Sequence, residues 1–354
     1  MRADPGDTIL VDRGTYLGGI VVPKAKHDLT IRGVDRTGVL LDGEDVRRNG
    51  ITVYADGVSI LNLSAHNFVV DAFHWIDADR FRASYLTIWN VGEYGIYAEG
   101  GERGRVDHDY VSGAADAAYY IGECEQCRAT LSHVVAALSA VGYSGTNASE
   151  VTIRDSLWDR NGAGIVPNTY ANEAHPPQER ASILRNTVTG SGRAAVPIST
   201  PLAGFIGIGI AIAGGNENRI HANRVGRSER YGIAVYPTAR RIVFTSPAPR
   251  DPGPPWRPRG NRVSNNAVSQ SGRADLALAR GVGAGNCFVR NAAATTVPRG
   301  LNVSRCARTS TPGDVRVAAE LTAGARRMFD ATLRRRRPPP YTAMPTPPAQ
   351  PGMP

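Results

Sequence analysis

The sequence contains a recurring phrase, Asn-Arg-[Ile/Val]-x-x-Asn-x-Val, which begins at Asn218 and again at Asn261. A shorter copy, Ile-x-x-Asn-x-Val, begins at Ile183. Upstream, apolar residues continue the pattern at a spacing of 23 residues, at Ile88, Val111, Val134 and Leu157. Repeats of this length, built from short β-branched runs with Asn and Gly at the corners, are typical of solenoids whose strands stack into parallel sheets.

Two further columns accompany these anchors. Eight residues after each anchor the chain carries mostly apolar residues: Ile96, Tyr119, Gly142, Ile165, Val196, Ile233 and Leu276. Two apolar columns at a fixed offset predict two strands per coil, separated by a corner. Two residues before the anchors lies a polar column, which predicts a ladder of stacked side chains at a corner: Asp109, Ser132, Asp155, Asn186, Asn223 and Asn266.

The repeat predicts one long all-β domain, a parallel β-helix of about ten coils over residues 1–312. Residues 313–337 contain the one fair helical pattern, and a helical cap there would cover the strand edges of the last coil. Residues 338–354 hold eight prolines. This composition cannot pack a core, so we expect a disordered, extended tail.

The charge and hydropathy of the chain limit its partners. The net charge is +9, but residues 326–354 contribute six arginines against one acid, so the repeat body is only mildly basic. The arginine run is typical of a solvated tail, and we expect no nucleic-acid partner. No apolar run approaches the roughly 18 residues that span a bilayer. The chain enters a strand almost at once without a signal peptide, so we expect its natural start to lie upstream.

The four cysteines favour disulfides over a metal site. Cys124 and Cys127 form a CxxC pair, but a zinc site needs a second pair nearby, and the other two cysteines lie some 160 residues away. Cys287 and Cys306 are about one coil apart. We predict the bridges Cys124–Cys127 and Cys287–Cys306, which favour an oxidising, extracytoplasmic compartment. Four free thiols are the alternative.

The opening motifs resemble those of the right-handed parallel β-helix repeat proteins of the pectate-lyase-like superfamily. The resemblance covers roughly residues 5–305 and is carried by Pro5-Gly-Asp-Thr-Ile, Gly14-Thr-Tyr, Leu29-Thr-Ile-Arg-Gly, Leu41-Asp-Gly and the Asn-Arg coils. Further motifs are similar to an uncharacterised group from high-GC Gram-positive bacteria: Gly142-Tyr-Ser-Gly-Thr-Asn, Gly164-Ile-Val-Pro-Asn, Pro176-Pro-Gln and Tyr341-Thr-Ala-Met-Pro. The superfamily includes polysaccharide lyases, hydrolases and uronan epimerases as well as non-catalytic adhesins, so the fold alone does not fix an activity.

A row of tyrosines is the first candidate for substrate binding. Tyr97, Tyr120 and Tyr143 are 23 residues apart, and each follows a predicted core position. We therefore expect them to point outward from adjacent coils, where they could form a platform for sugar rings. The alternative is an exterior stack that only stabilises coil pairing. Polar and aromatic residues expected on the same side of the coil extend the candidate set: Glu99, Glu123, Asn147, Asn168 and Tyr170. The loops that begin near Tyr170 are expected on the binding face.

The triplet Asp107-His108-Asp109 is the densest titratable motif and partly resembles the Asp-Pro-His-Asp motif of alginate-type epimerases. Abstraction of the C5 proton of a uronate needs a base and a positive group on the carboxylate. His108 or Tyr120 could be the base, and Arg105 or Arg128 could neutralise the carboxylate. The alternative is structural, with Asp109 in the ladder and Asp107 paired to an arginine.

Two functions follow from the sequence. The first is an extracytoplasmic enzyme that acts on a uronic-acid polysaccharide by lyase or epimerase chemistry, with Asp107, His108, Tyr120 and Arg128 as its catalytic residues. The second is a non-catalytic solenoid that binds glycans or a cell surface. We expect a monomer with no metal site or required cofactor, although Ca²⁺ could assist on an acidic glycan.

Overall fold

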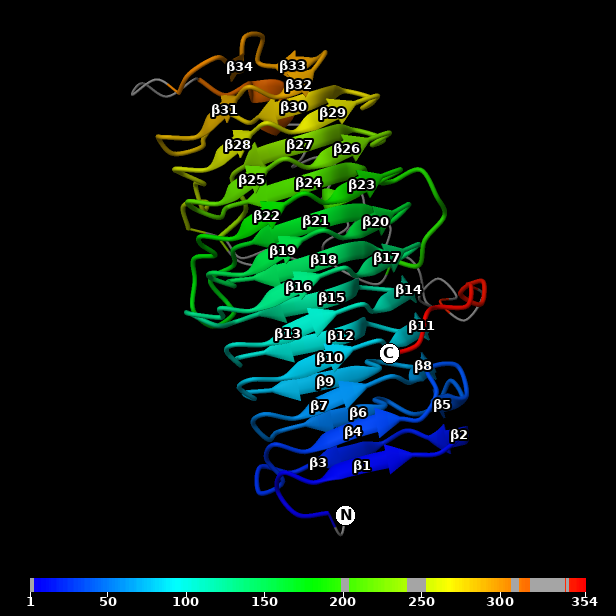
Figure 1. The fold of residues 1–354 in the computed structure, drawn as a ribbon. Helices are drawn as coiled ribbons and strands as arrows, with labels where there is room; N and C mark the ends of the chain where they lie inside the picture. Colours follow the sequence, from blue (N-terminus) through cyan, green and yellow to red (C-terminus); the bar gives the residue numbers. More distant parts are fainter. Residues whose placement is uncertain (1–2, 199–203, 241–252, 307–311, 319–340, 342–343) are drawn as a thin grey trace.

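The structure is a computed structural model, and it describes residues 3–198, 204–240, 253–306, 312–318, 341 and 344–354. The chain winds into a solenoid of three parallel sheets, in which each coil contributes one strand to each sheet (Figure 1). The coils thus contain three strands each rather than the two predicted, because a third strand, which belongs to sheet A, precedes the two predicted ones. None of the helices in the described part of the chain is long and apolar enough to cross a membrane.

The strands of each sheet follow one another along the solenoid axis. Sheet A contains β1 (Thr8–Val11), β4 (Thr30–Gly33), β7 (Ser59–Leu61), β10 (Arg82–Ser84), β13 (Arg105–Asp107), β16 (Thr130–Ser132), β19 (Thr152–Arg154), β22 (Ser182–Leu184), β25 (Arg219–His221), β28 (Arg262–Ser264), β31 (Cys287–Val289) and β34 (Asn302–Val303). Sheet B contains β2 (Gly14–Leu17), β5 (Val39–Asp42), β8 (Ser64–Phe68), β11 (Thr87–Val91), β14 (Tyr110–Ala114), β17 (Val135–Ala137), β20 (Leu157–Asp159), β23 (Thr187–Thr189), β26 (Arg224–Gly226), β29 (Ala267–Ser269) and β32 (Ala292–Ala293). Sheet C contains β3 (Ile20–Val22), β6 (Ile51–Val53), β9 (Phe73–Ile76), β12 (Tyr94–Glu99), β15 (Ala117–Gly122), β18 (Val141–Thr146), β21 (Ala163–Asn168), β24 (Ile208–Ala213), β27 (Tyr231–Tyr236), β30 (Ala274–Leu278) and β33 (Thr296–Val297). We number the coils 1 to 11 by their sheet C strand.

The core runs through the middle of the solenoid and is filled by one stack of inward side chains per sheet. Ile60, Ala83 and Val106 align in sheet A, and Ile233 and Leu276 align in sheet C. All five are buried in one continuous apolar cluster. Burial of this stack is the main stabilising term, because successive coils remove apolar surface from water along the whole length of the axis.

An Asn ladder closes the corner between sheets A and B, as the repeat predicts. The Asn223 Nδ2 group donates to Asn266 Oδ1 at 2.9 Å, and the Asn266 Nδ2 group donates to Asn291 Oδ1 at 2.9 Å. Each Nδ2 group also donates to a sheet A carbonyl of the preceding coil. Two predicted members lie elsewhere: Ser132 belongs to β16 of sheet A, and Asp155 precedes the ladder position, where Arg185 binds it.

The apolar columns predicted from the constant spacing of 23 residues are wrong in part, because the coils differ in length. The first residue of the sheet A strand is Arg82 in one coil and then Arg105, Thr130 and Thr152 in the next three, so the spacing first widens and then narrows. In sheet B, Val111 therefore aligns with Ala136 and Trp158. The predicted anchors Val134 and Leu157 lie in a corner and on the surface instead, and Leu157 is 38% exposed.

The same shift changes the predicted column in sheet C. The residue that aligns with Tyr119 is Tyr143 rather than Gly142, so the core has no gap at this level. In coil 8 the aligned residue is Ile210 rather than Val196, because the chain between β23 and β24 makes a long excursion.

Both predicted disulfides are present. Cys124 and Cys127 form one bridge, with Cα atoms 5.1 Å apart, at the corner between sheets C and A. Cys287 and Cys306 form the other, with Cα atoms 5.8 Å apart, at the C-terminal end of the solenoid.

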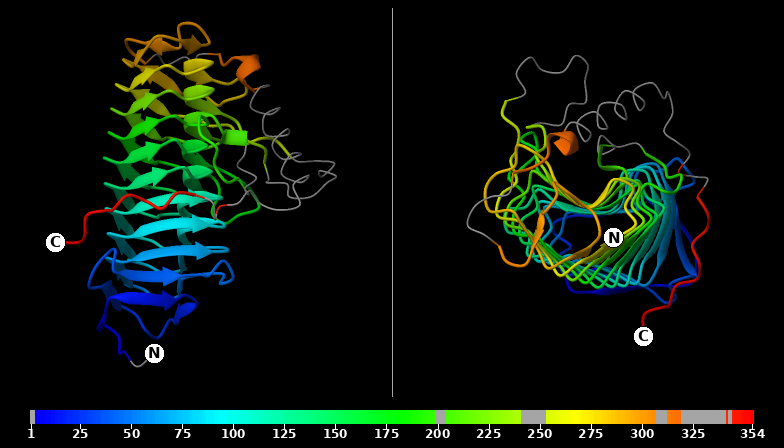
Figure 2. Two further views of the ribbon diagram at one scale, coloured as in Figure 1. Left: turned by 90° about the vertical axis from the view of Figure 1, so that its right-hand side faces the viewer. Right: turned by 90° about the horizontal axis from the view of Figure 1, so that it is seen from above.

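The two C-terminal segments are described in part. Residues 315–318 are helical, and the rest of the predicted cap lies outside the described residues. The last residues of the Pro-rich tail lie along the outside of the solenoid (Figure 2). There the Arg36 Nη1 group donates to Pro351 O at 2.8 Å, and the Met353 amide donates to Asn62 Oδ1 at 2.9 Å. This part of the tail is therefore held by coils 2 and 3, whereas the sequence predicts disorder.

Candidate functional site

The predicted catalytic residues Asp107 and His108 lie at the corner between sheets A and B. The His108 Nδ1 atom is 2.9 Å from Asp107 Oδ1, and the Arg105 Nε group is 3.2 Å from Asp107 Oδ2. Burial opposes ionisation of Asp107, but hydrogen bonds from Ser84 and His108 prevail and lower its pKa. The His108 ring stacks between Tyr85 and His133 with ring centroids 4.7 and 5.1 Å away. The pair is thus part of a corner stack.

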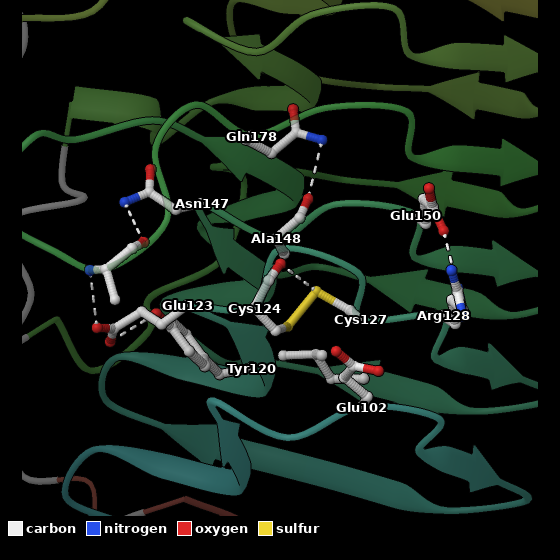
Figure 3. The surroundings of a disulfide bond; sticks show 12 residues. Glu102, Tyr120, Glu123, Cys124, Cys127, Arg128, Asn147, Ala148, Glu150 and Gln178 are labelled. Carbon is white, nitrogen blue, oxygen red and sulfur yellow. Dashed lines mark hydrogen bonds and ion pairs between the residues drawn. A yellow bond between two sulfur atoms is a disulfide. The ribbon is translucent and has the colours of Figure 1, made fainter. Parts of the chain in front are cut away.

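Tyr120 and Arg128 lie in other parts of the coil. Tyr120 belongs to β15 of sheet C, and Arg128 follows the disulfide at the corner between sheets C and A, with its Nε group 3.3 Å from Glu150 Oε2. Figure 3 shows Tyr120 with Glu123 on one side of the disulfide and Arg128 with Glu150 on the other. Asp107 is in sheet A, so the four predicted catalytic residues do not converge on one site.

The predicted row of three outward tyrosines is wrong at Tyr143. Tyr97 aligns with Tyr120 in sheet C, but Tyr120 aligns with Ser144 because the intervening coil is one residue longer than expected here. Tyr143 lies in the core, where it is 1% exposed and donates its hydroxyl to Ile121 O at 3.1 Å. Two outward tyrosines remain.

The predicted binding residues Asn147, Asn168 and Tyr170 are buried. The Asn147 Nδ2 group donates to Tyr170 O and Ala174 O, each at 2.8 Å, and so holds the loop after β21. The Asn168 Nδ2 group donates to Val166 O and Ser144 Oγ. Tyr170 packs in the apolar cluster on the outer face of sheet C. These contacts give all three residues a structural role in this conformation.

A different group of side chains gathers on the outer face of sheet C in coils 3 to 6. We call it the sheet C cluster, and its members are His74, Tyr94, Tyr97, Glu99, Tyr120, Glu123, Thr146 and Glu173. Its aromatic rings are in contact: the Tyr97 ring lies 4.3 Å from the His74 ring, 4.5 Å from the Tyr94 ring and 4.8 Å from the Tyr120 ring. The sheet positions these rings because consecutive strands bring aligned residues within about 4.8 Å of one another.

Glu99 is the ionised carboxylate of the cluster. The His74 Nε2 atom lies 3.1 Å from Glu99 Oε1, and the Tyr97 hydroxyl donates to Glu99 Oε2 at 2.7 Å. The hydrogen bond from His74 is the main reason that the pKa of Glu99 is lowered, against the effect of burial. The Glu99 side chain keeps 27% of its surface exposed. It is therefore both charged and accessible to solvent.

The pKa values of Glu123 and Glu173 are shifted in the opposite direction, upward. Burial is the main reason that the pKa of Glu173 rises to about 7, and the neighbouring Glu123 and Glu99 charges raise it further. Burial likewise raises the pKa of Glu123, whose Oε2 atom accepts the Ala174 amide at 3.2 Å. The loop after β21 thus brings a carboxyl group with a pKa of about 7 over coils 4 to 6, close enough to interact with Glu99.

A second acidic group lies at the other edge of the same strands. Burial, followed by the charge of Glu93, raises the pKa of Asp71 well above its usual range. Burial also raises the pKa of Glu93. Asp116 occupies the same corner one coil further on, and its charge acts on Asp71.

Among the described residues, no three acids, histidines or cysteines are grouped so as to hold a metal ion, and we assign no chemistry to Ca²⁺.

Sequence reasoning placed Glu99, Glu123 and Tyr120 on one side of the coil but missed His74. The signal for it was present, since His74 precedes Tyr97 by the same interval that separates Tyr97 from Tyr120, and the three align in sheet C. Extending the tyrosine column one coil toward the N-terminus would have found this histidine.

Comparisons with known proteins establish the fold. No family model and no curated protein matches the sequence. An exopolygalacturonase from Thermotoga maritima has a similar structure, with a TM-score of 0.53 and 8% identity over 84% of this chain and 83% of that chain. The surface protein and adhesin PfbA of Streptococcus pneumoniae has a TM-score of 0.50 and 10% identity over 84% of this chain and 88% of that chain. The chain therefore has the right-handed parallel β-helix fold of the pectate-lyase-like proteins.

Proposed function

We propose that this protein is a polysaccharide hydrolase that binds a glycan chain across the sheet C cluster. The observation that carries the proposal is that two neighbouring carboxyl groups tend toward opposite protonation states. The pKa of Glu99 is lowered by its hydrogen bond with His74, whereas burial raises the pKa of Glu173 to about 7. Carboxyl groups set apart in this way are the pattern expected of a general acid and its partner carboxylate.

The proposed reaction uses only groups of this chain and water. The protonated Glu173 carboxyl group donates its proton to the glycosidic oxygen as the bond to the anomeric carbon breaks. The Glu99 carboxylate either accepts a proton from the water that adds to that carbon or attacks the carbon itself, depending on the separation of the two carboxyl groups at the bound sugar. In the second route, water then cleaves the ester between the sugar and Glu99, and the Glu173 carboxylate takes the proton of that water, which restores both groups. His74 and Tyr97 hold the Glu99 carboxylate in place for either route.

The aromatic side chains of the cluster suit sugar binding. Tyr94 and Tyr97 are partly exposed and stack on each other, and the buried Tyr120 ring packs against both. Aromatic rings offer a rigid apolar face with little loss of conformational entropy. An exopolygalacturonase has the same fold, so this fold can support glycan processing.

The geometry favours hydrolysis over the lyase or epimerase chemistry predicted from the sequence. Both of those reactions need a positive group beside the uronate carboxylate. The sheet C cluster instead presents the ionised Glu99 beside two carboxyl groups with raised pKa values, Glu123 and Glu173, and Arg128 lies on the far side of the disulfide. The sugar that reacts here is therefore an uncharged one.

The cysteines support an extracytoplasmic compartment. Both bridges are formed, and disulfides persist in oxidising environments. An extracytoplasmic location, as the sequence predicts, is consistent with a polysaccharide substrate.

A non-catalytic glycan-binding solenoid is the second candidate. The observation that favours it is that every carboxyl group of the cluster already has a protein partner, such as the Tyr97 hydroxyl on Glu99. The similar structure of an adhesin agrees with this reading.

The two candidates are separated by measuring binding and cleavage on the same glycans. Neutral and acidic polysaccharides are incubated with the protein, with and without Ca²⁺, and the new reducing ends and the ultraviolet absorbance of unsaturated products are followed. We expect reducing ends without unsaturation. Glu99→Gln and Glu173→Gln should each lower the rate at least about 100-fold while binding is kept. The matched control is Glu125→Gln, an exposed glutamate outside the cluster.

Each other outcome has a defined meaning. Binding with no cleavage of any glycan would support the non-catalytic solenoid. Unsaturated product would support lyase chemistry and contradict the proposal, as would full activity in both glutamine variants.

A further inference from the structure

A cationic pocket lies at the corner between sheets B and C, in coils 7 to 10. Its volume is about 590 Å³, which is within the range of pockets that hold small ligands. We call it the Arg227 pocket, and it is lined by Asp159, Arg160, Thr189, Gly190, Arg193, Arg227 and Gln270. It lies outside the sheet C cluster, in coils further toward the C-terminus.

The pocket arises because a glycine interrupts a stack of corner residues. Arg160, Gly190, Arg227 and Gln270 each follow the last residue of an aligned sheet B strand and adopt a left-handed backbone conformation. Gly190 has φ of +68°, and a Cβ atom there would lie 3.0 Å from Arg160 Cγ. The missing side chain leaves a space between Arg160 and Arg227, which are two coils or about 10 Å apart along the axis.

The charge of the pocket is positive and only partly compensated. The Arg160 Nε group forms an ion pair with Asp159 Oδ2 at 2.9 Å. Neither Arg193 nor Arg227 forms an ion pair with an acid in the described part of the chain. The Arg193 guanidinium forms a long hydrogen bond of 3.5 Å to Ser228 O. Two guanidinium groups are thus available, with the Thr189 hydroxyl and the Gln270 amide as further donors.

We propose that the Arg227 pocket binds the carboxylate or sulfate group of an acidic sugar. A guanidinium group presents paired donors that match the paired oxygens of such an anion. The donors converge on one small space between three coils, which suits a single anionic group rather than a long polyanion.

A nucleic acid fits these observations less well. Single-stranded nucleic acids are bound by basic grooves that also carry aromatic side chains for base stacking. Among the described residues, those that line the Arg227 pocket include no aromatic side chain. A double-stranded nucleic acid would require an extended row of unpaired cations, whereas Arg160 already has an acid partner and Arg185 in a nearby corner is paired with Asp155.

The identity of the ligand as a glycan rests on the proposed function, whereas the anion site does not. The substrate would then carry an anionic residue that is bound away from the cleavage site.

The test is isothermal titration of the whole protein with three probes at constant ionic strength. The probes are an oligouronate, the same oligosaccharide with its carboxyl groups reduced to alcohols, and inorganic sulfate. We expect Arg193→Gln and Arg227→Gln each to weaken oligouronate binding about tenfold or more, as for the loss of a charged hydrogen bond. Binding of the neutral oligosaccharide should not change. The control is Arg299→Gln, which removes an exposed arginine outside the pocket.

Two variants test the pocket without removing a binding arginine. In Gly190→Asn the new side chain fills the space, while asparagine still tolerates the left-handed conformation. We expect this variant to bind the oligouronate no more tightly than its neutral counterpart. Asp159→Asn releases Arg160 from its partner, and we expect it to tighten oligouronate binding a few-fold. Thermal unfolding of each variant is measured as a control, and we expect each to unfold cooperatively as the wild type does.

Specific results would overturn the inference. Equal binding of oligouronate by the wild type, Arg193→Gln and Arg227→Gln would do so, as would an equal loss in Arg299→Gln. Binding of sulfate but not oligouronate would reduce the site to one for small inorganic anions, and tighter binding of an oligonucleotide would assign it to nucleic acid. If oligouronate binds as expected while Glu99→Gln and Glu173→Gln leave all products unchanged, the proposed function fails and the anion site stands.

Discussion

Replacement of Asp109 by Asn should stabilise the protein. Asp109 occupies the Asn ladder position of coil 5, where its Oδ1 atom accepts the Leu86 amide at 2.7 Å. Its Oδ2 atom is buried without a hydrogen-bond partner. In the later coils the corresponding Nδ2 group donates to a sheet A carbonyl, as Asn223 does to Ile183 O at 2.9 Å. The register places Ala83 O at the equivalent point for residue 109.

The size and pH dependence of the effect follow from the burial of the carboxyl group. Burial is the main reason that the pKa of Asp109 is raised well above its usual range, and the Arg36 charge opposes this only in part. A raised folded-state pKa means that stability is complete at low pH and is lost as the pH rises from about 4, where the unfolded chain ionises. Asp109→Asn gains one hydrogen bond and no longer has to keep a buried carboxyl group neutral at pH 7. Together these changes should raise the free energy of unfolding by about 1–3 kcal/mol at pH 7. Below about pH 4 the protonated acid can itself donate, so the gain should be small.

The measurement is urea unfolding of wild type and Asp109→Asn at a series of pH values from 3 to 8. We expect the difference in unfolding free energy to be near zero at the acid end and to grow toward neutrality. The reasoning would be refuted if Asp109→Asn were less stable at pH 7. That result would mean that Asp109 is ionised and serves as the counter-ion of Arg36, which is 2% exposed and otherwise bonded to neutral acceptors such as Thr87 Oγ1.

Three further predictions concern activity and stability. If Glu173 is the general acid, hydrolysis should fall as the pH rises through about 7, where this group loses its proton, and Glu173→Gln should lack that limb of the pH–rate profile. Serine replacement in the Cys287–Cys306 bridge, whose cysteines are 19 residues apart, should cost about 3 kcal/mol of unfolding free energy, whereas the Cys124–Cys127 bridge should contribute little. Deletion of residues 344–354 should speed hydrogen exchange near Arg36, because the guanidinium loses its Pro351 partner; unchanged exchange would contradict the contact.

The fold could be predicted because the asparagines of the repeat are recognised by residue type as well as by their spacing. From coil 8 to the last coil the Asn ladder fixes one residue per coil, so its members identify the corner regardless of how long each of these coils is. The apolar columns carry less information. Between Val134 and Ala137 each residue is small or apolar and could face inward, and only the unequal lengths of the neighbouring coils decide that Ala136 does. A longer coil followed by a shorter one left the overall spacing almost unchanged, so the constant interval no longer marked the same position.

The candidate site was predicted less well because dense titratable motifs are also good corner motifs. Asp107 and His108 attract attention by their proximity in sequence, yet the structure uses them to bind Arg105 and to stack on Tyr85. The groups that do converge come from strands and a loop that are far apart in the sequence, such as His74 and Glu173. Spacing within coils predicts neighbours on adjacent strands but not where a loop folds back over earlier coils.

The two proposed sites carry opposite charges, and this limits what substrate they can share. Glu99 in coil 4 is an ionised carboxylate, whereas Arg193 and Arg227 lie in coils 8 and 9. At about 4.8 Å per coil, the two sites are separated by roughly 20 Å along the solenoid axis. A uniformly anionic glycan would be attracted at one end and repelled where the bond is cleaved, and a neutral glycan would leave the arginines without a partner. A chain with an uncharged residue at Glu99 and an anionic residue several sugars away satisfies both. We therefore expect a uniformly acidic polymer to bind but to be cleaved more slowly than a partly neutral one, and the reverse order of rates would show that the two sites do not act on one chain.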